Sequence, residues 1–264
     1  MARKWGDQEN YPLRDTANLS RVMQYITTMI YDGDATSLKE EFATREFAAT
    51  HFPDFGDPGQ IHSILAGCDL PLYVTTNYDD FMYQALLYHR KRPKQDHGRW
   101  YAAGSVDNMV SPFTNPNYDP RPDEPLVFHL HGHYSVPKSL VLTEDDYIDY
   151  LVRLAGESFQ RDARSQTGLL PNYVYSRLRN NPLLFVGYGL HDWTFLVLFR
   201  ILLRGIPASE RRRHVSVQID PRERRRVAAR SYIEQYLRSQ SIQVFWESAE
   251  TFAEKLKEKL EGTL

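Results

Sequence analysis

Short apolar runs that end in small or polar residues alternate along this chain with segments whose apolar residues recur at helical intervals. The runs predict strands at 72–76, 126–130, 139–142, 183–187, 214–218 and 242–246. The intervening segments predict helices at 19–31, 38–50, 79–90, 144–154, 173–180, 192–203, 221–238 and 249–260, with a short one that ends at Ala66. This order predicts an α/β fold with a Rossmann-like, mostly parallel sheet and helices on both faces.

Local signals refine the boundaries of these elements. Ser37 and Glu40 have the spacing of a capping box, and Thr143 is a candidate N-cap for the helix that follows it. Residues 91–125 contain six prolines together with Asn, Asp and Gly, which predicts a loop or a small irregular insertion. Such a segment is either a functional flap or a poorly ordered excursion. We expect a single domain over residues 1–264.

Composition narrows the class of protein. The chain has 264 residues, of which 42% are hydrophobic, so it can bury a core. Its formal net charge of -2 gives no overall attraction to nucleic acid or membranes. Its one cysteine, Cys68, excludes an intramolecular disulfide and a multi-cysteine zinc site. Because no apolar signal core or membrane-length stretch is present, we expect a soluble, cytoplasmic protein.

Polar side chains gather where three of the predicted strands end, which in open α/β sheets is where nucleotides bind. After the first strand, Asn77 can orient a water or a ribose hydroxyl, or it can adopt a turn or cap the next helix. For Asp79 the same two roles are open, namely binding ribose and capping that helix. Thr75 and Thr76 fit strand residues as well as ligands.

Three histidines follow the second of these strands. His129 and His131 lie two residues apart and would share a face of the sheet, with His133 continuing the alternation beyond Gly132. They fit either hydrogen-bonded core residues or a general base that works near neutral pH. The spacing shows no third metal ligand, so we expect no metal. Gly132 would let a ligand approach the backbone closely.

The third strand end is the turn Gly187-Tyr188-Gly189, which is followed by His191 and Asp192. Glycines there permit close approach of a phosphate or ribose to backbone N–H groups, although any tight turn from strand to helix uses them. Asp192 suits the start of a helix even if it binds nothing. Together the three strand ends predict one site along one edge of one sheet.

Concentrated positive charge occurs at 211–213 and 222–226, diluted by Glu210 and Glu223. No series of aromatic residues accompanies it, so we interpret it as a solvated surface and not as a nucleic-acid site.

Taken together, several segments resemble the sirtuin-like (silent information regulator) superfamily, and in particular its bacterial branch of NADases in antiphage, that is antiviral, defence. The resemblance covers roughly residue 65 to the C-terminus. The matching segments are Thr75–Asp79, Leu130–Gly132, Val141–Tyr147, Leu184–Asp192, His214–Gln218 and Val244–Ser248.

The resemblance implies an NAD-consuming enzyme, a glycohydrolase that cleaves the nicotinamide–ribose bond, with NAD as substrate and no metal. It assigns Asn77 and His131 as catalytic residues, the amide positioning water or ribose and the imidazole acting as base. Its partners would be NAD and a second copy of the chain or associated defence proteins. The cofactor-binding residues would be Thr76, Tyr78, Asp79, Gly132, Gly187, Tyr188, Gly189 and Asp192.

Three departures from the family pattern leave alternatives open. No Gly-Ala-Gly strand and loop for the pyrophosphate precedes residue 70, so we expect an N-terminally truncated chain or an incomplete site. Gly189 stands where the family often has Ser. The zinc cysteines of deacetylase sirtuins are missing, which favours NAD hydrolysis over deacylation. The alternatives are a catalytically impaired module that binds NAD or ADP-ribose or mediates assembly, and an ADP-ribosyltransferase or protein deacylase.

Overall fold

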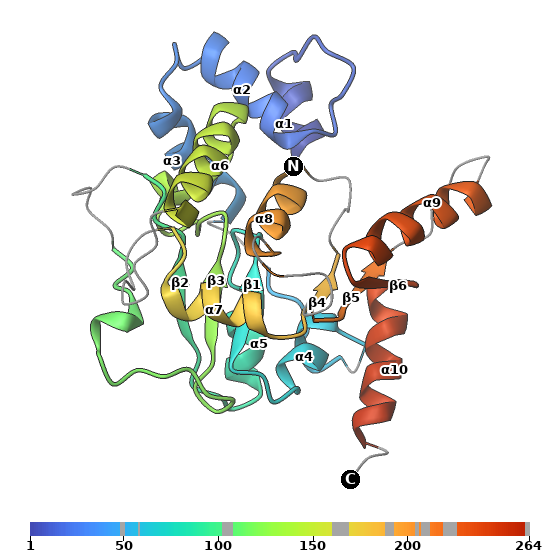
Figure 1. The fold of residues 1–264 in the computed structure, drawn as a ribbon. Coiled ribbons are helices and arrows are strands. Elements are labelled where there is room, and N and C mark those ends of the chain that lie inside the picture. The colour runs from blue at the N-terminus through green and yellow to red at the C-terminus, as the bar shows by residue number, and fades with distance from the viewer. Residues whose placement is uncertain are drawn as a thin grey trace. The chain divides into compact units, whose positions relative to one another are not determined.

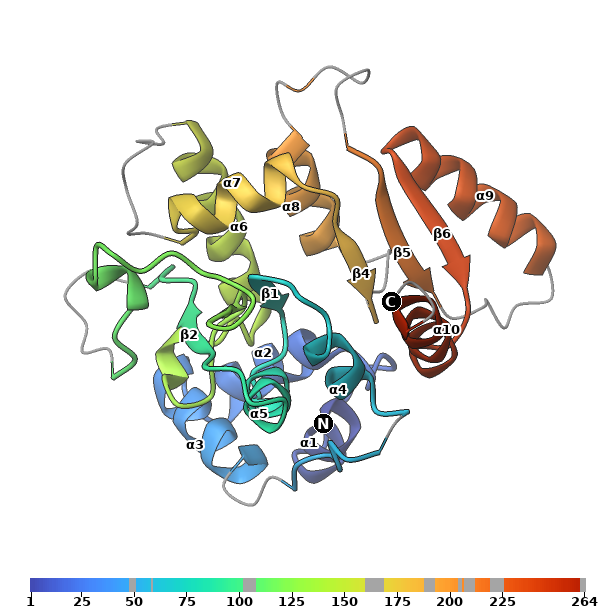
Figure 2. The same cartoon turned by 90° about the horizontal axis from the view of Figure 1, so that it is seen from below.

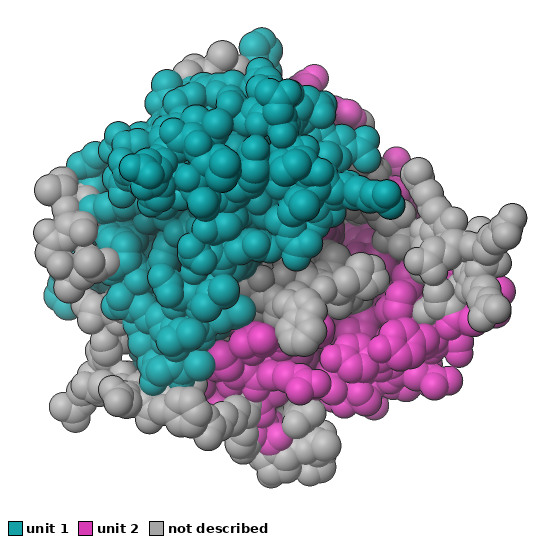
Figure 3. All heavy atoms as spheres, turned by 90° about the horizontal axis from the view of Figure 1, so that it is seen from above, with its two compact units in different colours: residues 1–53, 69–172 teal, residues 54–68, 173–264 magenta. Residues whose placement is uncertain are grey.

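The computed structural model describes residues 1–47, 51–57, 59–101, 108–159, 169–187, 193–203, 206, 212–218 and 226–261. These residues form two compact units (Figure 3). Unit 1 comprises residues 1–53 and 69–172, and unit 2 comprises residues 54–68 and 173–264. Each unit contains one three-stranded sheet.

Helices and strands alternate through most of the chain (Figure 1). The α-helices are α1 (Ala2–Gln8), α2 (Leu19–Met29), α3 (Ala35–Phe47), α4 (Ile61–Ala66), α5 (Phe81–Tyr88), α6 (Glu144–Phe159), α7 (Asn172–Asn180), α8 (Trp193–Leu203), α9 (Arg226–Ser239) and α10 (Ala249–Glu261). The strands are β1 (Leu72–Thr75), β2 (Lys94–His97), β3 (Leu126–His129), β4 (Leu184–Val186), β5 (His214–Gln218) and β6 (Ile242–Trp246). Two 3-10 turns, η1 (Pro112–Thr114) and η2 (Pro137–Ser139), complete the described elements.

The sheet of unit 1 has the order β1-β3-β2, and both pairings are parallel. The central strand β3 is buried along its whole length. Its sequence, Leu-Val-Phe-His, fits this position because a central parallel strand is covered on both faces. Thr75 pairs with His129 on one side of β3, and His97 pairs with His129 on the other. All three strands of unit 1 therefore end at the same level.

The N-terminal helices α1, α2 and α3 pack around a core that includes Trp5, Met23 and Phe42. Tyr78 and Tyr134, from the loops after β1 and β3, are packed against this core. The ring of Phe42 meets that of Tyr78 edge to face, at a centroid distance of 6.0 Å. The first 47 residues thus help to fix the loops at the carboxyl ends of the strands.

Unit 2 carries the second sheet, of order β4-β5-β6, which is also parallel (Figure 2). Helix α9 packs on β6, and α10 packs on β5 and on α4. Phe199, Leu203, Leu237 and Ile242 form its buried core. The two parallel sheets with flanking helices confirm the predicted α/β, Rossmann-like class. Where the sequence predicted one sheet, the described strands form two, β1-β3-β2 and β4-β5-β6.

Most predicted elements lie within a few residues of the observed ones, and the exceptions have local causes. The segment 91–125, predicted as a loop, contains the strand β2. The predicted strand 139–142 is absent, because Ser139 belongs to η2 and Val141 makes a single backbone bond, to the His131 carbonyl, in place of a ladder. Helix α3 begins before Ser37, since the carboxylate of Asp34 accepts the N–H groups of residues 36 and 37.

Thr143 does cap α6, as predicted. Its hydroxyl accepts the N–H of Asp146 at 3.1 Å, and the Asp146 carboxylate accepts the N–H of Thr143 at 2.9 Å. Among the helices in the described part of the chain, none combines the length and apolar character that a membrane crossing requires.

Candidate active site

The loops that carry Asn77 and His131 leave adjacent strands at the same level. Thr75 of β1 pairs with His129 of β3. Asn77 lies two residues after Thr75, and His131 lies two residues after His129. The N–H of Leu130 donates to the carbonyl of Thr75 at 2.8 Å, which extends the pairing into the second loop. The sheet therefore brings the two loops together, although each side chain has its own surroundings.

Asn77 is exposed, and its side chain is available to a ligand. Its backbone is held from two sides. The N–H donates to the Thr75 hydroxyl at 3.0 Å, and the carbonyl lies 3.2 Å from Nδ1 of His129. Thr76, the preceding residue, is half-buried.

His131 is buried, with 4% of its surface exposed. Its ring meets two tyrosines of α6 edge to face, with centroid distances of 5.4 Å to Tyr147 and 5.3 Å to Tyr150. These contacts fix the plane of the imidazole. The sequence offered no reason to connect these tyrosines with the histidine.

His129 and His131 do not share surroundings, contrary to the predicted strand alternation. Strand β3 ends at His129, and Gly132 has a φ of 91°, so the chain turns where the alternation was expected to continue. The ring of His129 instead meets that of His133 at 4.5 Å.

Gly132 is required by the fold. A Cβ placed on it would lie 2.1 Å from the carbonyl oxygen of Ser139 and 2.7 Å from the nitrogen of Leu140. The backbone that approaches this glycine closely is therefore the chain's own, which fills the space predicted for a ligand.

Tyr78 and Asp79 both have structural contacts. The Tyr78 hydroxyl donates to the carbonyl of Val141 at 2.7 Å. Burial, with smaller contributions from Tyr147 and Asp146, raises the pKa of the Tyr78 phenol well above its ordinary value. A carboxylate oxygen of Asp79 accepts the N–H of Phe81, the first residue of α5, at 3.0 Å, but the N-cap of this helix is Asp80 and not Asp79. Their predicted contacts with a cofactor stay predictions.

A hydrogen-bonded network lies behind the two loops, centred on the carboxylate of Asp80. One oxygen accepts from Nε2 of His133 at 2.8 Å and from the amide of Gln95 at 2.6 Å. The other oxygen accepts the Tyr134 hydroxyl at 2.9 Å. The Gln95 amide nitrogen also lies 3.4 Å from Nε2 of His129.

The pKa values in this network follow from burial and hydrogen bonding. Burial opposes ionisation of Asp80, but the bonds from His133 and Gln95 outweigh it and lower its pKa to about 2. Burial, reinforced by the nearby His133, lowers the pKa of His129 to about 3. Near neutral pH the network therefore contains a carboxylate anion and a neutral His129.

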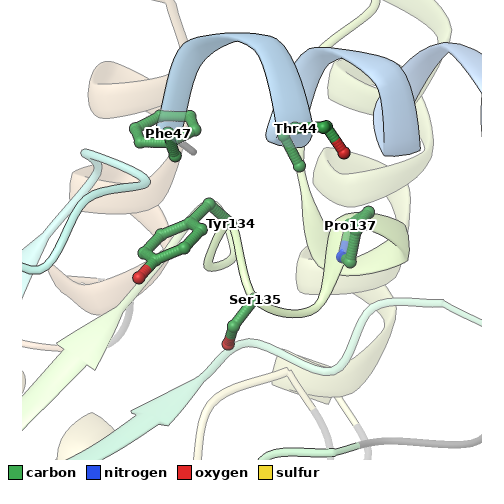
Figure 4. A pocket seen from close by; sticks show the side chains of 6 residues that line it. Thr44, Phe47, Tyr134, Ser135 and Pro137 are labelled. Carbon is green, nitrogen blue, oxygen red and sulfur yellow. The ribbon is translucent and has the colours of Figure 1, made fainter. Parts of the chain in front are cut away.

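A hollow of about 280 Å³ lies beside this network in unit 1 (Figure 4). The rings of Phe47 and Tyr134 stack within it at a centroid distance of 5.1 Å. Its lining residues are Ala43, Thr44, Phe47, Tyr134, Ser135 and Pro137. None of the sequence-predicted site residues lines it.

The third predicted strand end belongs to unit 2. Gly187 follows β4 with a φ of 73°, and no described atom lies within 4 Å of a Cβ placed on it. Tyr188, Gly189 and Asp192 lie outside the described residues. Across the part of the chain that the structure describes, no group of three or more His, Cys, Asp or Glu residues could hold a metal ion.

Gln95 and Asp80 are site residues that the sequence did not indicate. Gln95 was hidden because β2, Lys-Gln-Asp-His, has no apolar residue. Asp96 can be buried in this strand because it accepts hydrogen bonds from Arg99 and Ser111, both at 2.6 Å. The one sequence signal for this strand was the acidic Asp96 followed by the hydrogen-bond donors Arg99 and Ser111.

A family model described as SIR2-like domain matches residues 71–245, which is more than half of the chain. The match begins just before β1 and ends within β6, so it includes five of the six described strands in full and most of the sixth. Among curated proteins, none matches the chain significantly.

Proposed function

The chain belongs to the SIR2-like family, which points to an NAD-related enzyme, and on this premise we propose that it hydrolyses the nicotinamide–ribose bond of NAD. Asn77 and His131 are the proposed catalytic residues. The observation that carries the proposal is the parallel pairing of Thr75 with His129, from which both loops leave one sheet edge at the same level.

The chemistry of these groups suits the reaction. Departure of nicotinamide leaves an oxocarbenium-like sugar, which a water molecule then attacks. An amide both donates and accepts hydrogen bonds, so the exposed Asn77 can orient that water or a ribose hydroxyl. An imidazole can take up the proton released from the water near neutral pH.

The donor groups fit a nucleotide in part. The exposed amide of Asn77 is compatible with a ribose hydroxyl. At Gly132 the backbone of Ser139 fills the position that a Cβ would take.

The test is release of nicotinamide from NAD by the purified protein. His131→Ala should lower kcat by about two orders of magnitude, the usual effect of losing an acid–base group. His89→Ala, which changes an exposed histidine of the same unit at the C-terminal end of α5, is the matched control and should keep the wild-type rate. Intact protein that releases no nicotinamide would remove the proposal.

A second candidate function is binding of NAD or ADP-ribose without turnover. The observation that favours it is the burial of His131 against Tyr147 and Tyr150, which leaves 4% of the residue exposed. Calorimetry with ADP-ribose separates the candidates, since heat of binding without nicotinamide release indicates a sensor. Absence of both indicates an assembly module.

We further propose that NAD hydrolysis serves antiphage defence, with a second copy of this chain or an associated defence protein as partner. The support is the resemblance of the strand-end motifs to that branch of the family. Depletion of cellular NAD during phage infection, lost with His131→Ala, is the result expected in bacteria that express the protein. NAD levels that stay constant during infection would count against it.

A further inference from the structure

We propose that the hydrogen-bonded network of His129, Gln95, Asp80 and His133 positions the two catalytic loops relative to each other, so that these four are positioning residues for the reaction. This inference rests on the proposed function. Two of the four residues had no predicted role, and Gln95 comes from a strand that the sequence did not reveal.

The network begins at the backbone of Asn77. Nδ1 of His129 lies 3.2 Å from the Asn77 carbonyl, which can only accept a hydrogen bond, so Nδ1 carries the proton. Nε2 of the neutral ring is then an acceptor, and it faces the Gln95 amide at 3.4 Å. The low pKa of His129 agrees with this neutral form.

The network ends at the loop that carries His131. An amide has two N–H donors, so Gln95 can bond His129 and also donate to Asp80 at 2.6 Å. The same Asp80 oxygen accepts Nε2–H of His133 at 2.8 Å. Nδ1 of His133 in turn accepts the backbone N–H of Ser135 at 3.2 Å.

Every hydrogen bond of this network has one donor and one acceptor when His129 is neutral and Asp80 is ionised. The proton positions are therefore mutually consistent near neutral pH. His129 is fully buried and His133 nearly so, whereas Gln95 and Asp80 are half-buried, so water has little access to the two imidazoles. Removal of one member should therefore let the Asn77 loop and the His131 loop shift relative to each other.

The main variant is Gln95→Leu, which removes both amide bonds with little change in volume. Misplacement of reacting groups by about 1 Å can cost two orders of magnitude in rate. We expect kcat for nicotinamide release to fall by about 10- to 100-fold, with the KM for NAD within about threefold of wild type. The pH profile of kcat should keep its shape, since His131 remains.

Ser111→Ala is the matched control. It removes one hydrogen bond to Asp96, the neighbour of Gln95 on β2, and leaves both loops untouched. It should lower the unfolding temperature as Gln95→Leu does but leave kcat unchanged. Should Gln95→Leu not fold, Asp80→Asn and Asp80→Ala replace it, and the Asn variant, which keeps one accepting oxygen, should recover part of the rate.

The possible results separate the two proposals. Wild-type kcat in folded Gln95→Leu, or equal rates in the two Asp80 variants, would overturn the positioning role and leave the proposed function standing. Wild-type protein without nicotinamide release would remove the proposed function and this role together.

Discussion

Gly132 and Gly187 are two glycines with positive φ that follow parallel strands, and the sequence predicts the same use for both. Their φ angles, 91° and 73°, are similar. Their surroundings differ completely. A Cβ on Gly132 would lie 2.1 Å from the Ser139 carbonyl oxygen, whereas no described atom lies within 4 Å of one on Gly187.

This difference separates two reasons for a glycine at a strand end. At Gly132 the chain folds back on itself, and the small residue lets its own backbone approach. At Gly187 the left-handed conformation is the only constraint that the described residues show. A glycine therefore predicts close approach to the backbone but does not identify what approaches.

The largest expected effect is that of Gly132→Ala. The methyl group would force the Ser139–Leu140 backbone to move, and the left-handed φ adds strain of its own. We expect a loss of about 3 kcal/mol or more in the free energy of unfolding, measured by denaturant titration.

Gly33→Ala is the control for conformation alone. Gly33 has a φ of 86° and no described atom within 4 Å of a Cβ, so the change adds strain without a clash. It should cost about 1 kcal/mol. Equal costs at positions 33 and 132 would mean that the Ser139 backbone yields easily, and the distinction drawn here would fail.

The sequence predicted the fold well where apolar runs were strong. The strands at Leu72–Thr75 and Leu126–His129 were evident because buried parallel strands read as continuous apolar runs. Strand β2 was missed because its stability depends on partners distant in the sequence, such as Ser111, which bonds Asp96. A pattern read within a short window does not contain such partners.

The candidate site was predictable at the level of loops but not of side chains. Motifs placed Asn77 and His131 after adjacent strands, and the register confirms that placement of the loops. The sequence could not show that His131 packs between two tyrosines of α6 or that Asp80 joins two loops. Those contacts depend on the turn at Gly132, which redirects the chain after β3.

The next largest effect is the pH dependence of stability that His129, at the end of β3 and three residues before Gly132, should cause. The pKa of His129 falls from 6.5 to about 3 on folding, so below pH 6.5 the unfolded chain binds a proton that the folded chain does not. Stability is therefore full above pH 6.5 and declines as the pH falls towards 3. We expect a loss of about 2 kcal/mol from this group between pH 7 and pH 5, measured by denaturant titration.

His129→Gln tests the assignment, since glutamine does not titrate but can still donate to the Asn77 carbonyl. The variant should be less stable than wild type at pH 7, with the gap narrowing by about 2 kcal/mol at pH 5. His214, in the second unit, also has a pKa lowered by burial, so some acid sensitivity should remain in the variant. A gap that is the same at both pH values would contradict the neutral, buried state of His129.

The smallest expected effect on stability, and the one that bears most directly on the ligand, is that of Gly187→Ala. Since no described atom opposes the methyl group, the cost should be that of the left-handed φ alone, about 1 kcal/mol, as at Gly33. If NAD approaches the backbone here, the methyl group occupies space that the ligand needs, so the KM for NAD should rise about 10-fold or more, equivalent to about 1.4 kcal/mol. Gly33→Ala, with the same backbone strain, should leave that KM unchanged. An unchanged KM in Gly187→Ala would show that this glycine does not face the nucleotide, and the contrast with Gly132 would then concern folding alone.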